Sequence, residues 1–267
     1  MVRFFFCLSL LMVLPGSTAV AAASVFLEDL TWTELRDTMK AGATTIIIPV
    51  GGTEQNGPLM ALGKHNVRVK ALAGKIAATL GNAIVAPVVA YVPEGNISPP
   101  TEHMRFPGTI TVPDDVFEKV IESAARSFKQ HGFTDIVLIG DHGGYQKVLG
   151  ISAGRLNKEW SQGPARAHFI AEYYRASQGG YENALLAQGA HQDEIGTHAA
   201  LADTSLMLAV DPSLVRSAAL ASSAKLGNSD GIYGGNPSHA TAELGQYGVA
   251  EIVSKTVEAI RKATTRH

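Results

Sequence analysis

Apolar residues in this 267-residue chain fall into short β-branched runs that alternate with longer segments of helical periodicity. Four runs predict buried strands, at residues 44–50, 83–89, 135–140 and 167–171. Segments with helical signals predict helices at residues 31–42, 67–80, 113–132, 145–160, 198–210 and 242–264. Strands that alternate with helices of this length indicate βαβ units, so we predict an α/β fold with a mainly parallel sheet.

The first residues carry a different pattern. Arg3 precedes a continuous apolar run, Phe4 to Leu14, which is too short to span a bilayer. Pro15 and Gly16 end the run, and small residues at 19–23 offer cleavage sites. We predict a signal peptide at residues 1–23 and a periplasmic or secreted domain at 24–267, with an uncleaved membrane anchor as the alternative. The only cysteine, Cys7, would be removed with the signal peptide, which leaves neither disulfides nor thiolate ligands.

The composition and net charge of the chain limit the kinds of binding partner that we expect. The chain is 46% hydrophobic with a formal net charge of −2, which suits one soluble domain with a sizeable core. A charge so close to zero gives no reason to expect nucleic acid or an anionic membrane surface as a partner. Residues 91–109 are rich in proline and glycine and lack periodicity, and a loop of this length is usually functional.

Two of the predicted strands each end in glycines, with a side chain able to bind a metal beside them. Glu54 follows the strand at 44–50, and His142 follows the strand at 135–140. Ligands of open α/β sheets bind outside the carboxyl ends of strands, and parallel strands bring these ends to one edge. Glu54 and His142 can therefore converge, although most single loop carboxylates or histidines are only solvated or hydrogen-bonded.

A third candidate segment begins at His198. It leads into an apolar helical stretch that contains Asp203, five residues further on. Residues five apart share a helix face poorly. Either His198 lies at the helix entry and Asp203 one turn inside a common site, or His198 caps the helix and Asp203 pairs with a surface base.

Five blocks of the sequence resemble the signatures of the creatininase family, in the family's order. They are residues 45–65 (TIIIPVGGTEQNGPLMALGKH), 102–109 (EHMRFPGT), 141–144 (DHGG), 198–205 (HAALADTS) and 231–245 (GIYGGNPSHATAELG). The resemblance spans nearly all of the chain beyond the predicted signal peptide. It implies a creatininase-type three-layer α/β/α fold with a mainly parallel central sheet, and a homo-oligomer.

Members of this family are metal-dependent hydrolases, mostly of cyclic or linear amide bonds, and hold a pair of metal ions. Carried over by position, the resemblance assigns metal binding to Glu54 and His142. It assigns proton transfer to His198, so that Glu54 and His198 are the predicted catalytic residues. One bound metal is enough to polarise a carbonyl and to lower the pKa of a bound water to about 7.

Four positions depart from the family pattern. Asn56 stands at the place of a ligand histidine, His65 at the place of the aspartate that bridges both metals, and Asp203 at the place of a glutamate. Tyr145 replaces the usual asparagine. A neutral imidazole offers one lone pair and cannot bridge two cations, and an amide oxygen is a weak ligand. We therefore expect one metal per subunit.

The predicted ligands of this metal are Glu54, His65 and His142, with Asp203 as a fourth ligand or as a partner of a ligand. Such a set of nitrogen and oxygen donors suits Zn²⁺, and also Mn²⁺ or Fe²⁺. The remaining candidates are expected to contact the substrate or to shape the loops around the site. They are His103 and Glu102, which are expected to order the covering loop, together with Asn56 and Tyr145.

The expected function is hydrolysis of a carbon–nitrogen amide bond, possibly cyclic, in a small molecule. Two alternatives stay open. The chain could bind a metal or small ligand without turnover, or it could hydrolyse another bond, such as a lactone or a strained carbon–carbon bond next to a carbonyl. Creatinine itself is disfavoured as substrate because the departures fall where the metal pair of the family lies.

Overall fold

A four-stranded parallel sheet lies at the centre of the structure, a computed structural model that describes residues 24–265. Its strands are β1 (Thr45–Val50), β2 (Ala83–Val85), β3 (Asp135–Gly140) and β4 (Arg166–Phe169). They lie in the order β2-β1-β3-β4. The predicted signal peptide lies outside the described residues.

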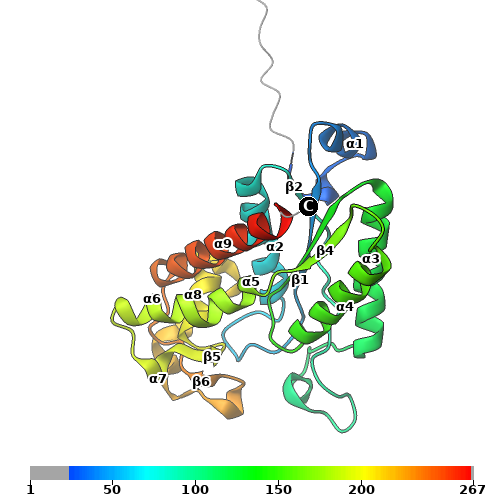
Figure 1. The fold of residues 1–267 in the computed structure, drawn as a ribbon. Coiled ribbons are helices and arrows are strands. Elements are labelled where there is room, and N and C mark those ends of the chain that lie inside the picture. The colour runs from blue at the N-terminus through cyan, green and yellow to red at the C-terminus, as the bar shows by residue number, and fades with distance from the viewer. Residues whose placement is uncertain (1–23, 266–267) are drawn as a thin grey trace, which may run out of the picture.

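Helices cover both faces of this sheet (Figure 1). The main helices are α1 (Trp32–Lys40), α2 (Lys64–Leu80), α3 (Asp114–His131), α4 (Gln146–Glu159), α8 (Leu201–Val210) and α9 (Ala242–Thr264). Shorter helical segments are α5 (Glu172–Arg175), a π-helical turn (Ala176–Gly180), α6 (Tyr181–Ala187) and α7 (Gln192–Ile195). Helices α3 and α4 lie on one face, and α2, α8 and α9 lie on the other. This arrangement confirms the predicted three-layer α/β/α fold.

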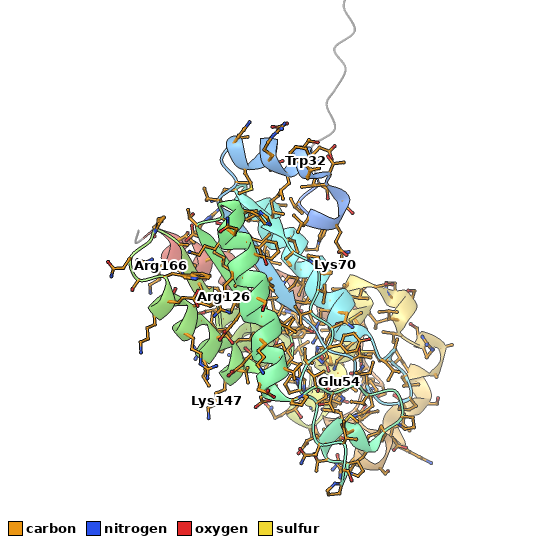
Figure 2. All side chains as sticks on the ribbon, turned by 90° about the vertical axis from the view of Figure 1, so that its right-hand side faces the viewer. Trp32, Glu54, Lys70, Arg126, Lys147 and Arg166 are labelled. Carbon is orange, nitrogen blue, oxygen red and sulfur yellow. The ribbon has the colours of Figure 1, made fainter. Side chains whose placement is uncertain are left out.

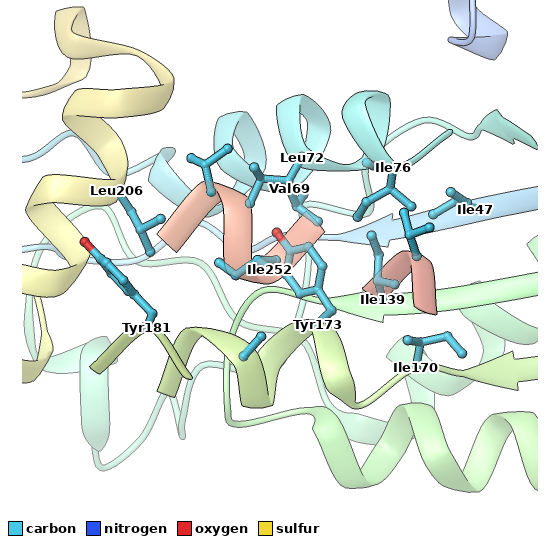
Figure 3. Packing of buried hydrophobic residues seen from close by; sticks show 14 of the residues in the cluster. Ile47, Val69, Leu72, Ile76, Ile139, Ile170, Tyr173, Tyr181, Leu206 and Ile252 are labelled. Atoms are coloured by element: carbon cyan, nitrogen blue, oxygen red, sulfur yellow. The ribbon is translucent and has the colours of Figure 1, made fainter. Parts of the chain in front are cut away.

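Alternate residues of each strand enter two separate cores. Ile47 and Ile139 pack with Leu72 of α2 and Ile252 of α9 on one face (Figure 3). Ile46 and its neighbours on the same side enter the opposite core, which α3 and α4 complete. Because both faces of a parallel sheet are covered, the two central strands are apolar over residues 46–50 and 136–139, which explains the uninterrupted runs in the sequence.

Two elements near the site differ from the sequence prediction. Helix α2 begins at Lys64, three residues before the predicted start. His198 ends a short strand, β5 (Gly196–His198), which pairs with β6 (Tyr233–Gly235) in antiparallel fashion. The next residue, Ala199, has a φ of +53°, which is incompatible with a helix, so α8 begins only at Leu201.

The candidate site lies at the carboxyl end of the sheet. Val50 and Gly140 are paired at the ends of β1 and β3, so the following loops leave from the same edge. Figure 2 shows Glu54 at the end of the molecule opposite to Trp32 of α1. Within residues 24–265, no helix has the length and apolar character that crossing a membrane requires.

Candidate functional site

Four side chains from three strand-end loops form a compact cluster. Glu54 follows β1, Glu94 and His103 belong to the loop after β2, and His142 follows β3. Each offers one ligand atom, and these atoms all lie within 4.8 Å of one another. Both carboxyl groups are buried, with Glu54 fully shielded from solvent. Two carboxylates and two imidazoles form a donor set that could hold a divalent metal ion.

Three of the four carboxylate oxygens in this cluster have no hydrogen-bond partner in the described part of the chain. Among residues 24–265, Oε2 of Glu54 and both oxygens of Glu94 are buried without a hydrogen bond. Nε2 of His103 and Nε2 of His142 lie 3.2 and 3.4 Å from Oε2 of Glu54. Ligands of a tetrahedral ion with bonds of 2.0–2.1 Å stand about 3.3 Å apart, so these separations fit a shared ion. Buried polar atoms without partners are otherwise costly.

The titration of the cluster reflects its burial and charge. Burial and the negative charge of Glu54 raise the pKa of Glu94 to about 10. Burial lowers the pKa of His142 to about 4, although the negative charge of Glu54 opposes this shift. Burial also lowers the pKa of His103. Both histidines are thus neutral near pH 7, the form that binds metals, whereas Glu94 needs a nearby cation to ionise.

Local hydrogen bonds fix the two histidine rings. The backbone N–H of Gly144 donates to Nδ1 of His142 over 3.2 Å, and the side-chain amide of Gln55 lies 3.1 Å from Nδ1 of His103. Such contacts on the far side of a ring set its orientation. Both rings therefore present Nε2 toward Glu54.

Tyr145 ties the two strand ends together. Its hydroxyl oxygen lies 2.9 and 2.6 Å from the carbonyl oxygens of Val50 and Gly51, and it accepts from the backbone N–H groups of Asp141 and His142. The side chain is fully buried. The structure thus places Tyr145 as a clamp between backbone segments, which corresponds to the loop role among the two that we predicted for it.

His65 lies in an ion-pair network and is not one of the four side chains of the cluster. Its Nε2 is 2.6 Å from Oε1 of Glu54, and its Nδ1 is 2.5 Å from Oδ2 of Asp141. Arg68 donates to the same aspartate, at 2.9 Å from Nε. Because both ring nitrogens of His65 already contact carboxylates, neither is available to an ion, which differs from its predicted role as a ligand.

Asp203 is held by two buried cations. Lys64 bonds to its Oδ2, and Nη1 of Arg68 lies 2.6 Å from its Oδ1. The backbone N–H of Ala199 also donates to Oδ2. Burial opposes ionisation, but Lys64 and Arg68 hold the pKa of Asp203 well below its usual range. The structure therefore does not bring Asp203 into the cluster, and the predicted pairing with a surface base is in fact a buried one.

His198 lies beside the cluster and faces Glu54. Its Nε2 is 2.9 Å from the carbonyl oxygen of Gln55, a contact that requires a proton on Nε2. The lone pair of Nδ1 then faces Oε1 of Glu54 at 3.6 Å. Burial, reinforced by the charge of Lys64, lowers the pKa of His198 to about 3.

The two other predicted residues shape the loops. The buried amide of Asn56 donates to the carbonyl oxygens of Glu54 and Ala61, at 2.9 and 3.0 Å, and so closes the turn after β1. Glu102 is exposed, with a φ of +46°, and its carbonyl oxygen accepts from Arg105. Its side chain is not part of the cluster, so Glu102 contributes through the course of the loop.

A cavity of about 350 Å³ opens above the cluster. The cations and carboxylates at its base are Lys64, Arg68, Asp141 and Asp203, and these neutralise one another. Its remaining wall carries polar groups, from Tyr174, Ser177, Gln178, Gln192, Thr197 and Tyr233, and one further carboxylate, that of Glu182, which accepts from Gln192. A cavity of this size and lining suits a small polar molecule.

Comparison with known proteins identifies the family. Residues 28–260 match the sequence profile of the creatininase family, described as creatinine amidohydrolase. The chain belongs to the creatininase family. A solved structure named "Creatininase Mn" has a TM-score of 0.74 at 23% identity, over 90% of this chain and 99% of that chain. The family signatures in the sequence and the predicted fold are both confirmed.

Curated relatives in the creatininase family are named as hydrolytic enzymes. The 3-dehydro-scyllo-inosose hydrolase of Thermotoga maritima is 27% identical over 67% of this chain and 56% of that protein. The mycofactocin precursor peptide peptidase of Mycolicibacterium smegmatis is 28% identical over 81% of this chain and 84% of that protein. The creatinine amidohydrolase of Pseudomonas putida is 28% identical over 49% of each chain. The match thus spans only about half of the first and third relatives.

Sequence reasoning from the creatininase signatures missed the residues that complete this site. Glu94 lies in a loop without periodicity. The only sign of it in the sequence is that an acidic residue stands among apolar and small residues. Lys64 and Arg68 carried a clearer signal. They are four residues apart and in line with Leu72, on the helix face that is buried. A charge on that face has to find an opposite charge inside the protein.

Proposed function

We propose that this chain is a metal-dependent hydrolase that cleaves a carbon–nitrogen amide bond in a small, polar molecule. The observation that carries the proposal is the pair of buried carboxylates, Glu54 and Glu94, whose unpaired oxygens lie beside His103 and His142 at the base of the cavity. These four residues would hold one divalent cation. Zn²⁺ suits this donor set, as do Mn²⁺ and Fe²⁺.

The residues of this chain supply the rest of the chemistry. When bound, a divalent ion polarises a carbonyl and makes water a stronger acid. His198 offers the unprotonated Nδ1 beside Glu54, where it takes up a proton and returns it to the leaving nitrogen. The polar groups of the cavity wall, such as those of Gln178, Gln192 and Tyr233, hold the substrate by hydrogen bonds.

Metal analysis together with activity measurements tests this proposal. Purified protein is dialysed against Zn²⁺, Mn²⁺ or Fe²⁺ and assayed for divalent ions and for hydrolysis of lactams, linear amides and short peptides. We expect bound metal and amide hydrolysis in the wild type, and the loss of both in His142→Ala and His103→Ala. His239→Ala is the matched control, because that ring is 71% exposed and lies on the surface. A metal-free but active wild type would refute the proposal.

A second candidate is hydrolysis of a carbonyl-containing ring other than an amide. It is favoured by the hydroxyl and amide groups of the cavity wall and by the relative named 3-dehydro-scyllo-inosose hydrolase. Polyhydroxylated cyclic ketones and lactones belong in the same substrate panel. Metal binding without turnover of any class would instead support a binding protein.

We also propose that the protein is exported and that it forms a homo-oligomer. A periplasmic or secreted location is supported by the apolar run and the small residues within positions 1–23. Association into a homo-oligomer is supported by exposed apolar side chains on the loop after β2, those of Tyr91, Ile97 and Ile110. Fractionation of the source cells and light scattering of the purified protein test the two statements separately.

A further inference from the structure

Lys64 and Arg68 place two permanent positive charges next to the metal-binding cluster. Both side chains are almost completely buried, with exposed fractions of 0% and 4%. Nζ of Lys64 bonds to Asp203 and lies 3.6 Å from Oε1 of Glu54. Burying an ammonium group is strongly unfavourable unless its partners are well placed. Lys64 is therefore part of an assembly of charged side chains that compensate one another.

The charges of this assembly leave room for one divalent ion. Its carboxylates are those of Glu54, Glu94 and Asp141, which are buried, and of Asp203, which is partly buried. Against these four negative charges stand the two permanent cations, which leaves a balance of two negative charges. One divalent ion neutralises that balance, and a second would leave two positive charges in a buried site. A proton shared on His65, which contacts two carboxylates, would add to this excess.

The groups around Lys64 are themselves metal-binding groups. Its ammonium faces oxygens of Glu54 and Asp203, and Nδ1 of His198 lies 3.6 Å from the same Glu54 oxygen. Two carboxylates and an imidazole nitrogen are a common donor set for zinc and related ions. Here they surround an amino group of the protein.

We propose that the Lys64 ammonium occupies the place of a second metal ion, so that the site binds a single divalent cation and uses the lysine as its second positive charge. This inference rests on the proposed function, since it requires an ion in the cluster of Glu54, Glu94, His103 and His142. Lys64 also lines the cavity, so its charge faces the substrate side. The second charge is therefore present whatever the metal supply.

Metal stoichiometry of folded variants tests the proposal. Wild type, Lys64→Ala and Lys70→Ala are saturated with Zn²⁺, desalted and analysed for zinc per chain. We expect one ion in the wild type and two in Lys64→Ala, where the shortened side chain frees both the donors and the space. Lys70→Ala is the matched control on the same helix, with a side chain 46% exposed, and should keep one ion.

The outcomes separate this inference from the proposed function. Two ions in the wild type would overturn the role of Lys64 and leave the metal-dependent hydrolase standing. No ion in the wild type would overturn both. A single ion in Lys64→Ala, with a native near-UV circular dichroism spectrum, would overturn the inference alone.

A second variant covers the case in which Lys64→Ala fails to fold. Lys64→Met removes the charge but keeps most of the side-chain volume. The one remaining ion should then bind at least about tenfold more tightly in calorimetry, because neighbouring cations repel strongly at short range even at an effective dielectric constant of about 20. Unchanged or weaker binding would contradict the proposal.

Discussion

The hydroxyl oxygen of Tyr145 lies 2.6 Å from the carbonyl oxygen of Gly51, so a side chain that follows β3 holds the backbone that follows β1. The same hydroxyl accepts from the N–H of His142. Glu54 and His142 come from segments far apart in the sequence, and this one group fixes the distance between their loops. The geometry of the cluster thus depends on a residue that does not line it.

Removing that hydroxyl should weaken both the fold and the site. Tyr145→Phe leaves backbone groups at two strand ends without a partner, and we expect a loss of about 1–3 kcal/mol in the free energy of unfolding. Urea unfolding measures it, and metal affinity should fall in parallel. Tyr247→Phe, on a side chain 43% exposed, should change stability by less than about 0.5 kcal/mol. Equal stability of Tyr145→Phe and the wild type would contradict the clamp.

Arg68 joins two aspartates inside the protein, and its loss should be costly. Arg68→Met leaves the buried Asp141 without its guanidinium partner and Asp203 with Lys64 alone, for which we expect a loss of about 3–5 kcal/mol in unfolding free energy. Arg126→Met is the matched control. That arginine forms ion pairs on the surface with a side chain 42% exposed, and pairs of that kind contribute about 0–1 kcal/mol.

Acid sensitivity gives an independent check on the same pairs. Although burial opposes it, the charge of Arg68 and the contact with His65 lower the pKa of Asp141 below its ordinary value of 3.8, and Asp203 is lowered further. The stability that a depressed carboxyl pKa contributes is present above the ordinary value and is lost as pH falls through the folded-state value. Thermal unfolding between pH 6 and 2 should show this loss in the wild type and a smaller one in Arg68→Met.

The fold could be predicted because it depends on patterns that extend over many residues. The uninterrupted apolar run of Thr45–Val50 indicated a strand covered on both faces, and the helical periods around it indicated the covering layers. Glu54 and His142 could be found for a related reason, since parallel strands bring their ends to one edge.

The composition of the cluster could not be predicted in the same way. The predicted start of α2 fell three residues late, which hid that Lys64 and His65 lie on its buried face. Which of several acids reaches His142 depends on the course of the loop after β2, and no period in that loop shows that Glu94 turns inward. Similarly, the positive φ of Ala199 that places His198 on a strand is a product of tertiary packing.

Glu94 should make the metal-free protein less stable as pH rises. Its pKa is raised to about 10 by burial and by Glu54, so the folded state favours the protonated acid. The stability linked to that proton is complete below the ordinary carboxyl value of 4.5 and is lost progressively as pH rises toward 10. Glu94→Gln should remove this dependence when thermal unfolding is followed between pH 5 and 9 in the presence of a chelator.

The same variant separates a ligand from a merely buried acid. If Glu94 binds the ion, Glu94→Gln should also lose most of the rise in unfolding temperature that added Zn²⁺ gives the wild type. Glu258→Gln is the control, with a side chain 75% exposed. A wild-type pH profile combined with an undiminished response to zinc in Glu94→Gln would exclude this residue from the metal site.

His198 should act on the reaction without holding the ion. Its Nε2 is tied to the carbonyl of Gln55, and its Nδ1 faces Glu54, a placement suited to carrying a proton. We expect His198→Ala to lower kcat by about 10²–10⁴, the usual contribution of a general acid–base group, while zinc content stays at the wild-type level. His239→Ala should leave both unchanged. If His198→Ala lost its zinc together with its activity, the residue would be a ligand, and the assignment of Glu54, Glu94, His103 and His142 as the metal-binding set would have to be revised.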